Sequence, residues 1–200
     1  MKATFFVDSA SAEISGSTLE KVHQDGHEIA CLGQAGLHHT SEILEDISRA
    51  KSAIKKYLGK SKSHQHKTRA NSMGGRSRDE PPDESASWYR PRDGSRDIRV
   101  LRAANRAGMV VALWSVCVYD WDASPEDIKR RIENQVHSGG GDIILLHCAL
   151  PDYLKPPAAA NRPPHDVISA TKEVISHASA NLGQQGVTLT ELCSTNGHEV

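Results

Sequence analysis

The sequence is poor in aromatic residues and has almost no net charge. Only 4% of its 200 residues are Phe, Trp or Tyr, so Ala, Val, Ile and Leu must supply most of a core. The 24 basic and 25 acidic side chains leave a formal charge of −1. This balance gives no electrostatic reason to expect a nucleic-acid partner or an anionic membrane surface. No apolar run reaches the roughly 18 residues of a membrane-spanning helix, so no membrane partner is expected either.

The four cysteines, Cys31, Cys117, Cys148 and Cys193, include no C-x-x-C pair, which argues against a zinc ribbon or a thioredoxin-type motif. Their spacing is not that of a disulfide framework, and the apolar stretch at the N-terminus is too short for a secretory signal. We therefore expect the chain as written to be cytoplasmic. The first three fall near the ends of expected strands, where they are either small buried hydrophobes or thiolate ligands of a metal.

Hydrophobic patterning predicts alternating strands and helices. Strands are expected at 3–7, 27–31, 109–118, 143–146 and 187–189, and helices at 18–24, 41–57, 95–107, 125–137 and 166–182. Such alternation is typical of parallel βα units in a barrel or a doubly wound sheet. The length suits a single domain over residues 1–200.

Residues 60–87 interrupt this order. The segment has almost no large apolar side chains, so burial cannot offset the entropy of ordering it, and we expect a disordered or flexible insertion. Its basic part lacks interleaved aromatics, which argues against a nucleic-acid site. His64 and His66 are either solvated or metal-binding.

Polar residues follow the expected strands at the places where parallel α/β proteins carry their chemistry. They stand at 31–40, 119–122 and 147–148, and the loop at 88–94 adds arginines and a proline. Six segments in order are A-T-F-F-V at 3–7, G-H-E-I-A at 26–30, R-P-R-D-G at 90–94, W-S-V with D-W at 114–121, G-D-I-I-L-L-H at 141–147 and V-T-L-T-E-L at 187–192.

Together these segments resemble the polysaccharide deacetylases of NodB type, over nearly the whole chain outside 60–87. The resemblance implies an α/β fold, a NodB-type distorted (β/α) barrel that is incomplete at the N-terminus. It also implies hydrolysis of the carbon–nitrogen bond of an N-acetylated carbohydrate by a metal-activated water. The partner expected from it is an N-acetylated glycan, as for chitin deacetylases.

The resemblance gives His147 the role of general acid, which protonates the leaving amine. Asp120 would orient His147, and Trp121 would line the sugar groove. The alternatives are a structural histidine at 147 and an ordinary packing role for Trp121.

Arg90 corresponds to the arginine that orients the catalytic base in the family. Because that base is absent from the chain as written, Arg90 is expected to pair with Asp93, Asp120 or Asp122. The backbone N–H of Asp93 falls where the family places an oxyanion donor.

The metal site departs from the family pattern. Leu32 and Gly36 stand where the family has its H-T-x-x-H histidines, and the Asp-Asp pair that precedes the 3–7 strand is missing. His38 and His39 are weak substitutes or exposed loop residues, and a catalytic zinc needs three protein ligands. We expect no retained cofactor, or zinc if the protein is active.

Three hypotheses follow: a deacetylase, a non-catalytic relative that binds glycan or protein, or a fragment of a longer deacetylase. The strand missing from the barrel would leave an open sheet edge, which either a partner chain, such as a second copy of this chain, or a fold that closes differently would have to cover.

Overall fold

A four-stranded parallel sheet, covered by helices, organises most of the described chain. The structure, a computed structural model, describes residues 1–58, 88–120, 123–148, 168–169, 171–172, 175–176 and 183–195. The chain divides into two compact units. The larger spans Lys2–Ala112 with Val187–Val200, and the smaller spans Leu113–Gly186 with Met1.

The sheet of the larger unit has the order β1-β2-β3-β4, with every neighbouring pair parallel. The strands are β1 (Thr4–Val7), β2 (Glu28–Leu32), β3 (Trp88–Arg90) and β4 (Val110–Val111). Cys31 is in register with both Val7 and Tyr89, so the carboxyl ends of β1, β2 and β3 meet at one edge. Among the described residues β1 pairs with β2 alone; cover of this edge by a second copy stays a prediction.

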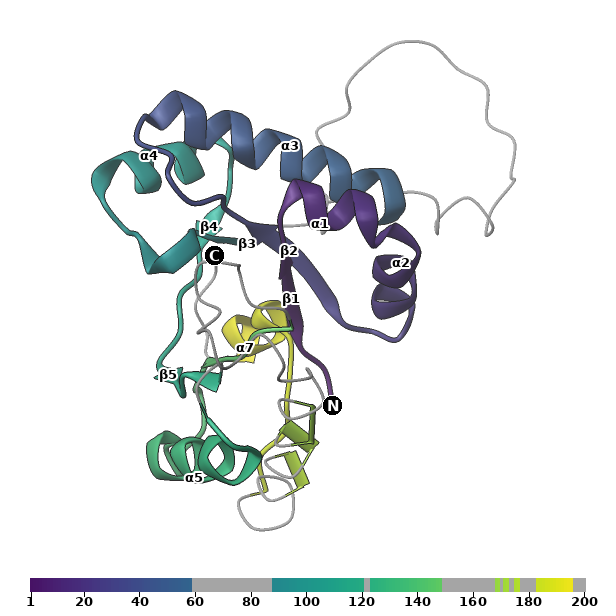
Figure 1. Cartoon of the computed structure of the whole chain (residues 1–200), viewed down its shortest axis with the longest axis vertical. Coiled ribbons are helices and arrows are strands. Elements are labelled where there is room, and N and C mark those ends of the chain that lie inside the picture. The colour runs from purple at the N-terminus through teal and green to yellow at the C-terminus, as the bar shows by residue number, and fades with distance from the viewer. Residues whose placement is uncertain are drawn as a thin grey trace. The chain divides into compact units, whose positions relative to one another are not determined.

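Helices α1 (Ser9–Ile14), α2 (Gly16–Gln24), α3 (Thr40–Leu58) and α4 (Ile98–Arg106) gather over the sheet of this unit (Figure 1). The apolar spacing of α3 puts Ile43, Ile47, Ala50, Ile54 and Leu58 on one buried stripe. This stripe packs with β2 residues and the small side chains of α4 in one hydrophobic cluster. Asp97 begins α4 by accepting the N–H groups of Arg99 and Val100.

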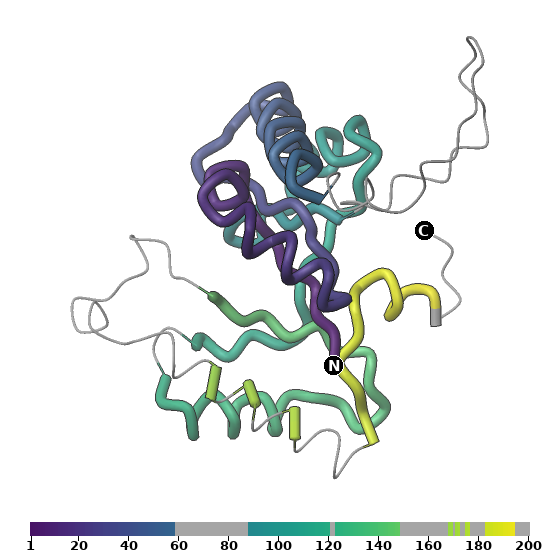
Figure 2. Tube along the Cα trace, turned by 90° about the vertical axis from the view of Figure 1, so that its right-hand side faces the viewer, coloured from purple at the N-terminus to yellow at the C-terminus, as the bar shows by residue number. Residues whose placement is uncertain are grey.

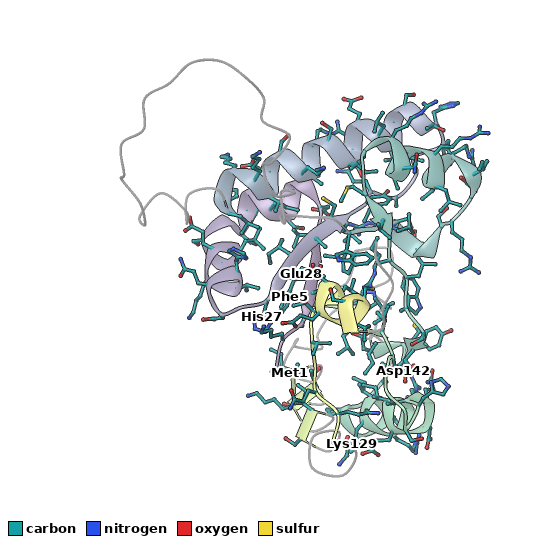
Figure 3. The ribbon with its side chains drawn as sticks, turned by 180° about the vertical axis from the view of Figure 1, so that it is seen from behind. Met1, Phe5, His27, Glu28, Lys129 and Asp142 are labelled. Carbon is teal, nitrogen blue, oxygen red and sulfur yellow. The ribbon has the colours of Figure 1, made fainter. Side chains whose placement is uncertain are left out.

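The last described helix, α7 (Leu189–Thr195), is anchored at the amino ends of β1 and β2. Thr188 and Glu191 form a reciprocal capping box, each side chain accepting the other's backbone N–H at 3.1 and 3.0 Å. Leu189 N–H donates to Thr4 Oγ1 at 2.9 Å and to Glu28 Oε2 at 3.1 Å. Figure 2 shows α7 beside the start of β1, and Figure 3 shows Glu28 there with Phe5 and His27.

The smaller unit has a two-stranded parallel sheet of β5 (Val116–Cys117) and β6 (Ile144–Leu145), with α5 (Pro125–Gln135) between them in sequence. Its buried core comprises Val116, Val118, Ala123, Ile128 and Ile132. The expected start of α5 is confirmed, because Ser124 Oγ accepts the N–H of Asp127 and proline occupies the first turn.

Several expected strands are wrong. The apolar run 109–118 is two short strands of different sheets, since Ala112 N–H bonds to Tyr89 while Ser115 and Val116 N–H bond to Ile143. The segment 88–90, read as a loop, is the fully buried strand β3. In the expected strand 143–146, only Ile144–Leu145 form β6, and both are half-buried. Residues 187–189 form no strand: Val187 and Thr188 precede α7 and Leu189 begins it, because the capping box outweighs their β-branched composition.

Helix boundaries also differ from expectation. Helix α1 was not expected, although Asp8 caps it by accepting the N–H of Ser11. Helix α3 begins at Thr40, one residue before the expected start. The expected insertion at 60–87 lies outside the described residues, as does most of 166–182. Within the described part of the chain, no helix is both long and apolar enough to cross a bilayer.

Ile47 and Ile98 make a matched test of the larger unit's core, because Ile47 is fully buried and Ile98 is 58% exposed. We expect Ile47→Ala to lower the free energy of unfolding by about 2–5 kcal/mol through lost transfer energy and a cavity. Ile98→Ala should change it by less than about 0.5 kcal/mol. Urea denaturation followed by far-UV circular dichroism measures both, and equal losses would contradict the assigned core.

Candidate functional site

Arg92 joins the carboxyl ends of β1 and β2. It lies in the short 3-10 turn η2 (Arg92–Gly94) after β3. Its Nη2 donates to Asp8 Oδ2 at 2.8 Å, and its Nε donates to the Gly33 carbonyl at 3.0 Å. Both charged side chains are less than one-fifth exposed, so this pair is shielded from solvent screening. Sequence reasoning assigned neither residue a role, although Asp8 directly follows a strand.

Arg90, the last residue of β3, is buried. Its Nε donates to the Ala112 carbonyl at 3.2 Å, and its guanidinium carbon lies 3.9 Å from the centre of the Phe6 ring. Burial lowers the pKa of Arg90 to about 10. The guanidinium is therefore fixed on the sheet at its carboxyl edge. Its expected pairing with Asp93, Asp120 or Asp122 stays a prediction.

Asp93 adopts a left-handed backbone conformation within η2, with φ of 59°. Its side chain is exposed, and the preceding Pro91 is buried. Aspartate tolerates this conformation better than most residues, which explains why the turn accommodates it. The role of its N–H as an oxyanion donor stays a prediction.

Asp46, on α3, is a buried carboxyl beneath the loop that follows β2. It is 1% exposed, and its Oδ2 accepts the Gln34 N–H at 3.0 Å. Its Oδ1 accepts no hydrogen bond, and the nearest cationic nitrogen, Nη2 of Arg49, is 3.9 Å away. Burial raises the pKa of Asp46 above its ordinary value. The Asp46 carboxyl therefore fixes the start of this loop through the Gln34 N–H, although its burial costs desolvation free energy.

A carboxyl whose pKa is raised by folding stabilises the folded state below its unfolded pKa, near 4, and that contribution is lost as the pH rises through the folded value. Asn cannot titrate, and its amide oxygen can still accept the Gln34 N–H. We therefore expect Asp46→Asn to gain stability relative to the wild type as the pH rises from 4 to 7, measured by urea denaturation at each pH. Glu45→Gln, on the exposed side of α3, is the control. Parallel profiles for the two variants would contradict this assignment.

His147 and Asp120 form a pair at the carboxyl ends of β6 and β5 in the smaller unit. The Asp120 side chain is 1% exposed, and that of His147 is 22% exposed. Asp120 Oδ2 accepts the backbone N–H of His147 at 2.7 Å, and Oδ1 lies 2.8 Å from His147 Nδ1. The two bonds compensate the burial of the carboxylate and fix both the backbone and the ring of His147.

The pairing decides which ring nitrogen of His147 carries the proton in the neutral ring. A carboxylate only accepts hydrogen bonds, so Nδ1 carries the proton and Nε2 carries the lone pair. The structure thus supplies the contact expected between Asp120 and His147. The general-acid role of His147 stays a prediction, and Trp121, with Asp122, lies outside the described residues.

A second histidine–aspartate pair lies at the opposite end of the same strands. Asp142, labelled in Figure 3, precedes β6 and accepts bonds from Ser115 Oγ at 2.9 Å and from the His137 N–H at 2.7 Å. His137 Nδ1 lies 3.0 Å from Asp142 Oδ1, and the His137 side chain is 77% exposed. These bonds lower the pKa of Asp142 and tie the end of α5 to β6. The His137–Asp142 pair therefore lies at the amino ends of β5 and β6, away from Asp120 and His147.

The two pairs allow a matched test of the imidazole at 147. In the neutral wild type we expect the His147 proton on Nδ1, seen in the ¹⁵N shifts of the ring by long-range ¹H–¹⁵N NMR. In Asp120→Asn the side-chain amide can accept a hydrogen bond from a protonated Nδ1 or donate one to an unprotonated Nδ1. It therefore fixes the tautomer less strictly, and at least about one-tenth of the His147 rings should carry the proton on Nε2 instead. Asp142→Asn should leave the His147 shifts unchanged. An unchanged His147 spectrum in Asp120→Asn would refute the pairing.

The residues at the family's metal positions do not fit a metal ion. Leu32 ends β2 with a hydrocarbon side chain, and Gly36 has none and adopts φ of +76°. His38 and His39 are exposed, and their backbone N–H groups bond to Glu42 Oε2 at 3.0 and 3.1 Å. Across the described residues, no group of three or more His, Cys, Asp or Glu side chains could hold a metal. Cys31 is fully buried, and burial raises its pKa to about 12, which disfavours the thiolate.

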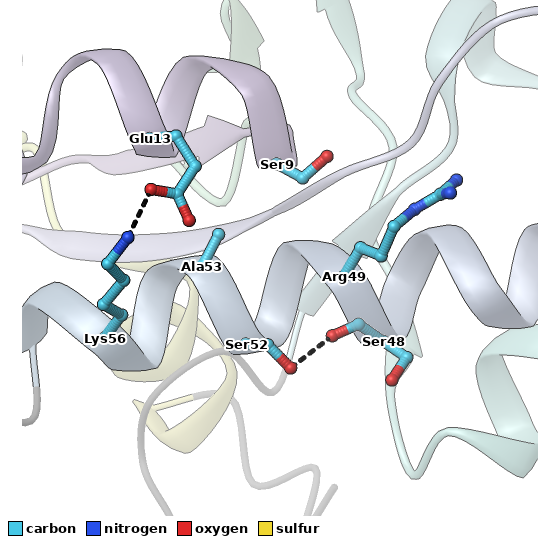
Figure 4. A pocket seen from close by; sticks show the side chains of 7 residues that line it. All are labelled: Ser9, Glu13, Ser48, Arg49, Ser52, Ala53 and Lys56. Carbon is cyan, nitrogen blue, oxygen red and sulfur yellow. Dashed lines mark hydrogen bonds and ion pairs between the residues drawn. The ribbon is translucent and has the colours of Figure 1, made fainter.

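A groove of about 430 Å³ lies between α1 and α3 (Figure 4). Its polar groups are largely satisfied by one another, because Lys56 pairs with Glu13 at 2.6 Å and Ser52 Oγ donates to the Ser48 carbonyl at 2.9 Å. None of the candidate site residues lines it. The candidate site residues therefore lie at the carboxyl ends of the strands and not in this groove.

No protein-family model matches the chain. A curated relative, the uncharacterized protein YlxY of Bacillus subtilis (strain 168), is 26% identical over 155 residues, which are 74% of this chain and 40% of YlxY. The chain therefore spans less than half the length of this relative.

Three solved structures are similar over almost the whole chain. Peptidoglycan deacetylase PdaC from Bacillus subtilis has a TM-score of 0.69 at 22% identity, covering 98% of this chain and 77% of PdaC. A family 4 acetyl xylan esterase from Clostridium thermocellum, in complex with cobalt, gives 0.65 at 22%, covering 99% and 80%. BA3943 from Bacillus anthracis, a CE4 family pseudoenzyme, gives 0.64 at 16%, covering 96% and 55%.

These similarities confirm the expected fold class: the chain has the α/β fold, with parallel sheets, of the NodB-type polysaccharide deacetylases. At such identities the likeness shows the fold alone, and function has to be argued from the residues at the site.

Proposed function

We propose that this chain is a polysaccharide deacetylase-like domain that binds N-acetylated carbohydrate without carrying the metal of the hydrolases whose fold it shares. Two observations carry the proposal, one in each unit. In the smaller unit Asp120 holds His147 through two bonds. In the larger unit Leu32 and Gly36 stand at the positions of the expected histidines.

The proposed binding of carbohydrate rests on fixed polar groups at the carboxyl ends of the strands in each unit. In the larger unit these are Arg90 and Arg92, both held by carbonyl or carboxylate acceptors. In the smaller unit His147 is partly exposed through its ring. Hydroxyl and acetamido groups are bound by such pre-positioned donors, because little side-chain entropy is lost on binding. The neighbours PdaC and the acetyl xylan esterase act on carbohydrates, which supports the same class of ligand for this chain.

The statement that the chain carries no such metal rests on the chemistry of the side chains at residues 32 and 36. A leucine offers no lone pair, and a glycine offers no side chain, so neither replaces an imidazole ligand. The pseudoenzyme BA3943 has the same fold, which shows that the fold occurs in proteins described as lacking activity. We therefore assign no catalytic step to a metal in this chain.

A hydrolase is the second candidate, and the His147–Asp120 pair favours it. A histidine held in one tautomer, with Nε2 directed away from its carboxylate, is the arrangement of a general acid–base group. In such a reaction water would first add to the acetyl carbon, and His147 in its doubly protonated form would then give its Nε2 proton to the amine nitrogen as the carbon–nitrogen bond breaks and acetate leaves. The acetyl xylan esterase of the same fold was solved in complex with a cobalt ion, which supports a metal site in this second candidate.

Metal content and acetate release decide between the candidates. For purified protein dialysed against zinc, we expect well under one zinc ion per chain, measured by elemental mass spectrometry. With zinc or cobalt and tetra-N-acetylchitotetraose we expect acetate release at the level of the blank, while calorimetry detects binding of the sugar. Stoichiometric zinc together with acetate release would reverse the ranking of the two candidates.

Two variants make the result interpretable. Leu32→His with Gly36→His should raise zinc retention above the wild type, because it restores two imidazoles, although a side chain at the positive φ of residue 36 costs about 1 kcal/mol. If the wild type does release acetate, His147→Gln should lower the rate about 10²–10⁴-fold. Failure of the sugar to bind, by calorimetry, would refute both candidates.

A further inference from the structure

Tyr119 is an exposed aromatic residue in a strained turn beside the His147–Asp120 pair. Its side chain is 56% exposed, and its backbone adopts φ of 52°, a conformation that bulky residues rarely occupy. The flanking residues are buried: Val118 is 0% exposed and Asp120 is 5% exposed. The strain therefore turns one aromatic ring out between two residues that face the interior.

The turn is fixed from the α5 side. Arg131 Nη1 donates to the Val118 carbonyl at 2.7 Å and lies 3.5 Å from the Tyr119 carbonyl. From the other side, Asp120 Oδ2 accepts the backbone N–H of His147, and Asp120 Oδ1 lies 2.8 Å from His147 Nδ1. These contacts hold the backbone on both sides of Tyr119, so the ring is displayed from a rigid support next to the candidate site. A strained and rigid position of this kind is typical of functional sites.

Burial of the ring does not explain the strain. In a chain with few aromatics, Tyr119 is 56% exposed, so it contributes little to the core. Asn or Gly would adopt the same φ with less strain. A flat apolar face with a polar tip is suited to stack on the C–H face of a pyranose ring while its hydroxyl bonds to a sugar hydroxyl.

We propose that Tyr119 is a sugar-stacking residue that binds one pyranose unit of the glycan next to His147. This inference rests on the proposed carbohydrate-binding function and adds to it a specific contact. Tyr119 makes that contact through its ring face, so it is a binding residue and takes no part in proton transfer.

Two variants separate the ring from the backbone. Tyr119→Phe keeps the stacking face at the same φ, and Tyr119→Asn removes the ring while accepting that φ more readily. By calorimetry with tetra-N-acetylchitotetraose, we expect Tyr119→Phe to bind within about threefold of the wild type and Tyr119→Asn to bind about tenfold or more weakly. Thermal unfolding should give Tyr119→Asn a Tm equal to or above that of the wild type.

Each outcome has one meaning. Wild-type affinity in Tyr119→Asn would overturn the stacking role while leaving the proposed function intact. A lowered Tm in Tyr119→Asn, with equal loss of binding in Tyr119→Phe, would show that the residue is structural and would also overturn it. No binding by the wild type would refute the proposed function and the stacking role together.

Discussion

The parallel alignment of the strands is the constraint on which the candidate site depends. Because β1, β2 and β3 run in the same direction, residues that follow them in sequence meet at one edge, where Arg92 bonds to Asp8 and Gly33. The same rule in the smaller unit brings Asp120, after β5, to His147, after β6. Side chains separated by tens of residues thus come within hydrogen-bond distance without a dedicated local motif.

Buried carboxylates differ in this fold in how completely hydrogen bonds compensate their burial. Asp120 is fully compensated by two N–H groups and fixes a ring that can exchange protons. Asp46 is only partly compensated, and its raised pKa records the cost of leaving one oxygen without a hydrogen-bond donor. A third carboxylate, Asp142, repeats the histidine pairing at the amino ends of the strands, where it closes the end of α5. Position along the strand, and not residue pairing alone, separates the structural pair from the candidate functional one.

The chain shares its fold with PdaC and with the pseudoenzyme BA3943, although Leu32 and Gly36 stand where the sequence resemblance leads one to expect histidines. Leu32 lies in the ladder of β2, in register with Arg90, so a leucine at this position is compatible with the sheet. Gly36 lies in a loop at positive φ. A fold does not by itself determine which side chains stand at such positions.

The sequence determined the alternation of strands and helices, the start of α5 at Pro125, and the resemblance that led to the fold. It also placed His147 and Asp120 at the ends of expected strands, since local patterns of period and capping are written in neighbouring residues. Only the tertiary structure decided that 109–118 divides between two sheets and that 88–90 is a buried strand. It alone revealed the Arg92–Asp8 pair, the uncompensated Asp46 and the outward ring of Tyr119. These features depend on contacts between residues far apart in the chain and on backbone angles, neither of which a local pattern encodes.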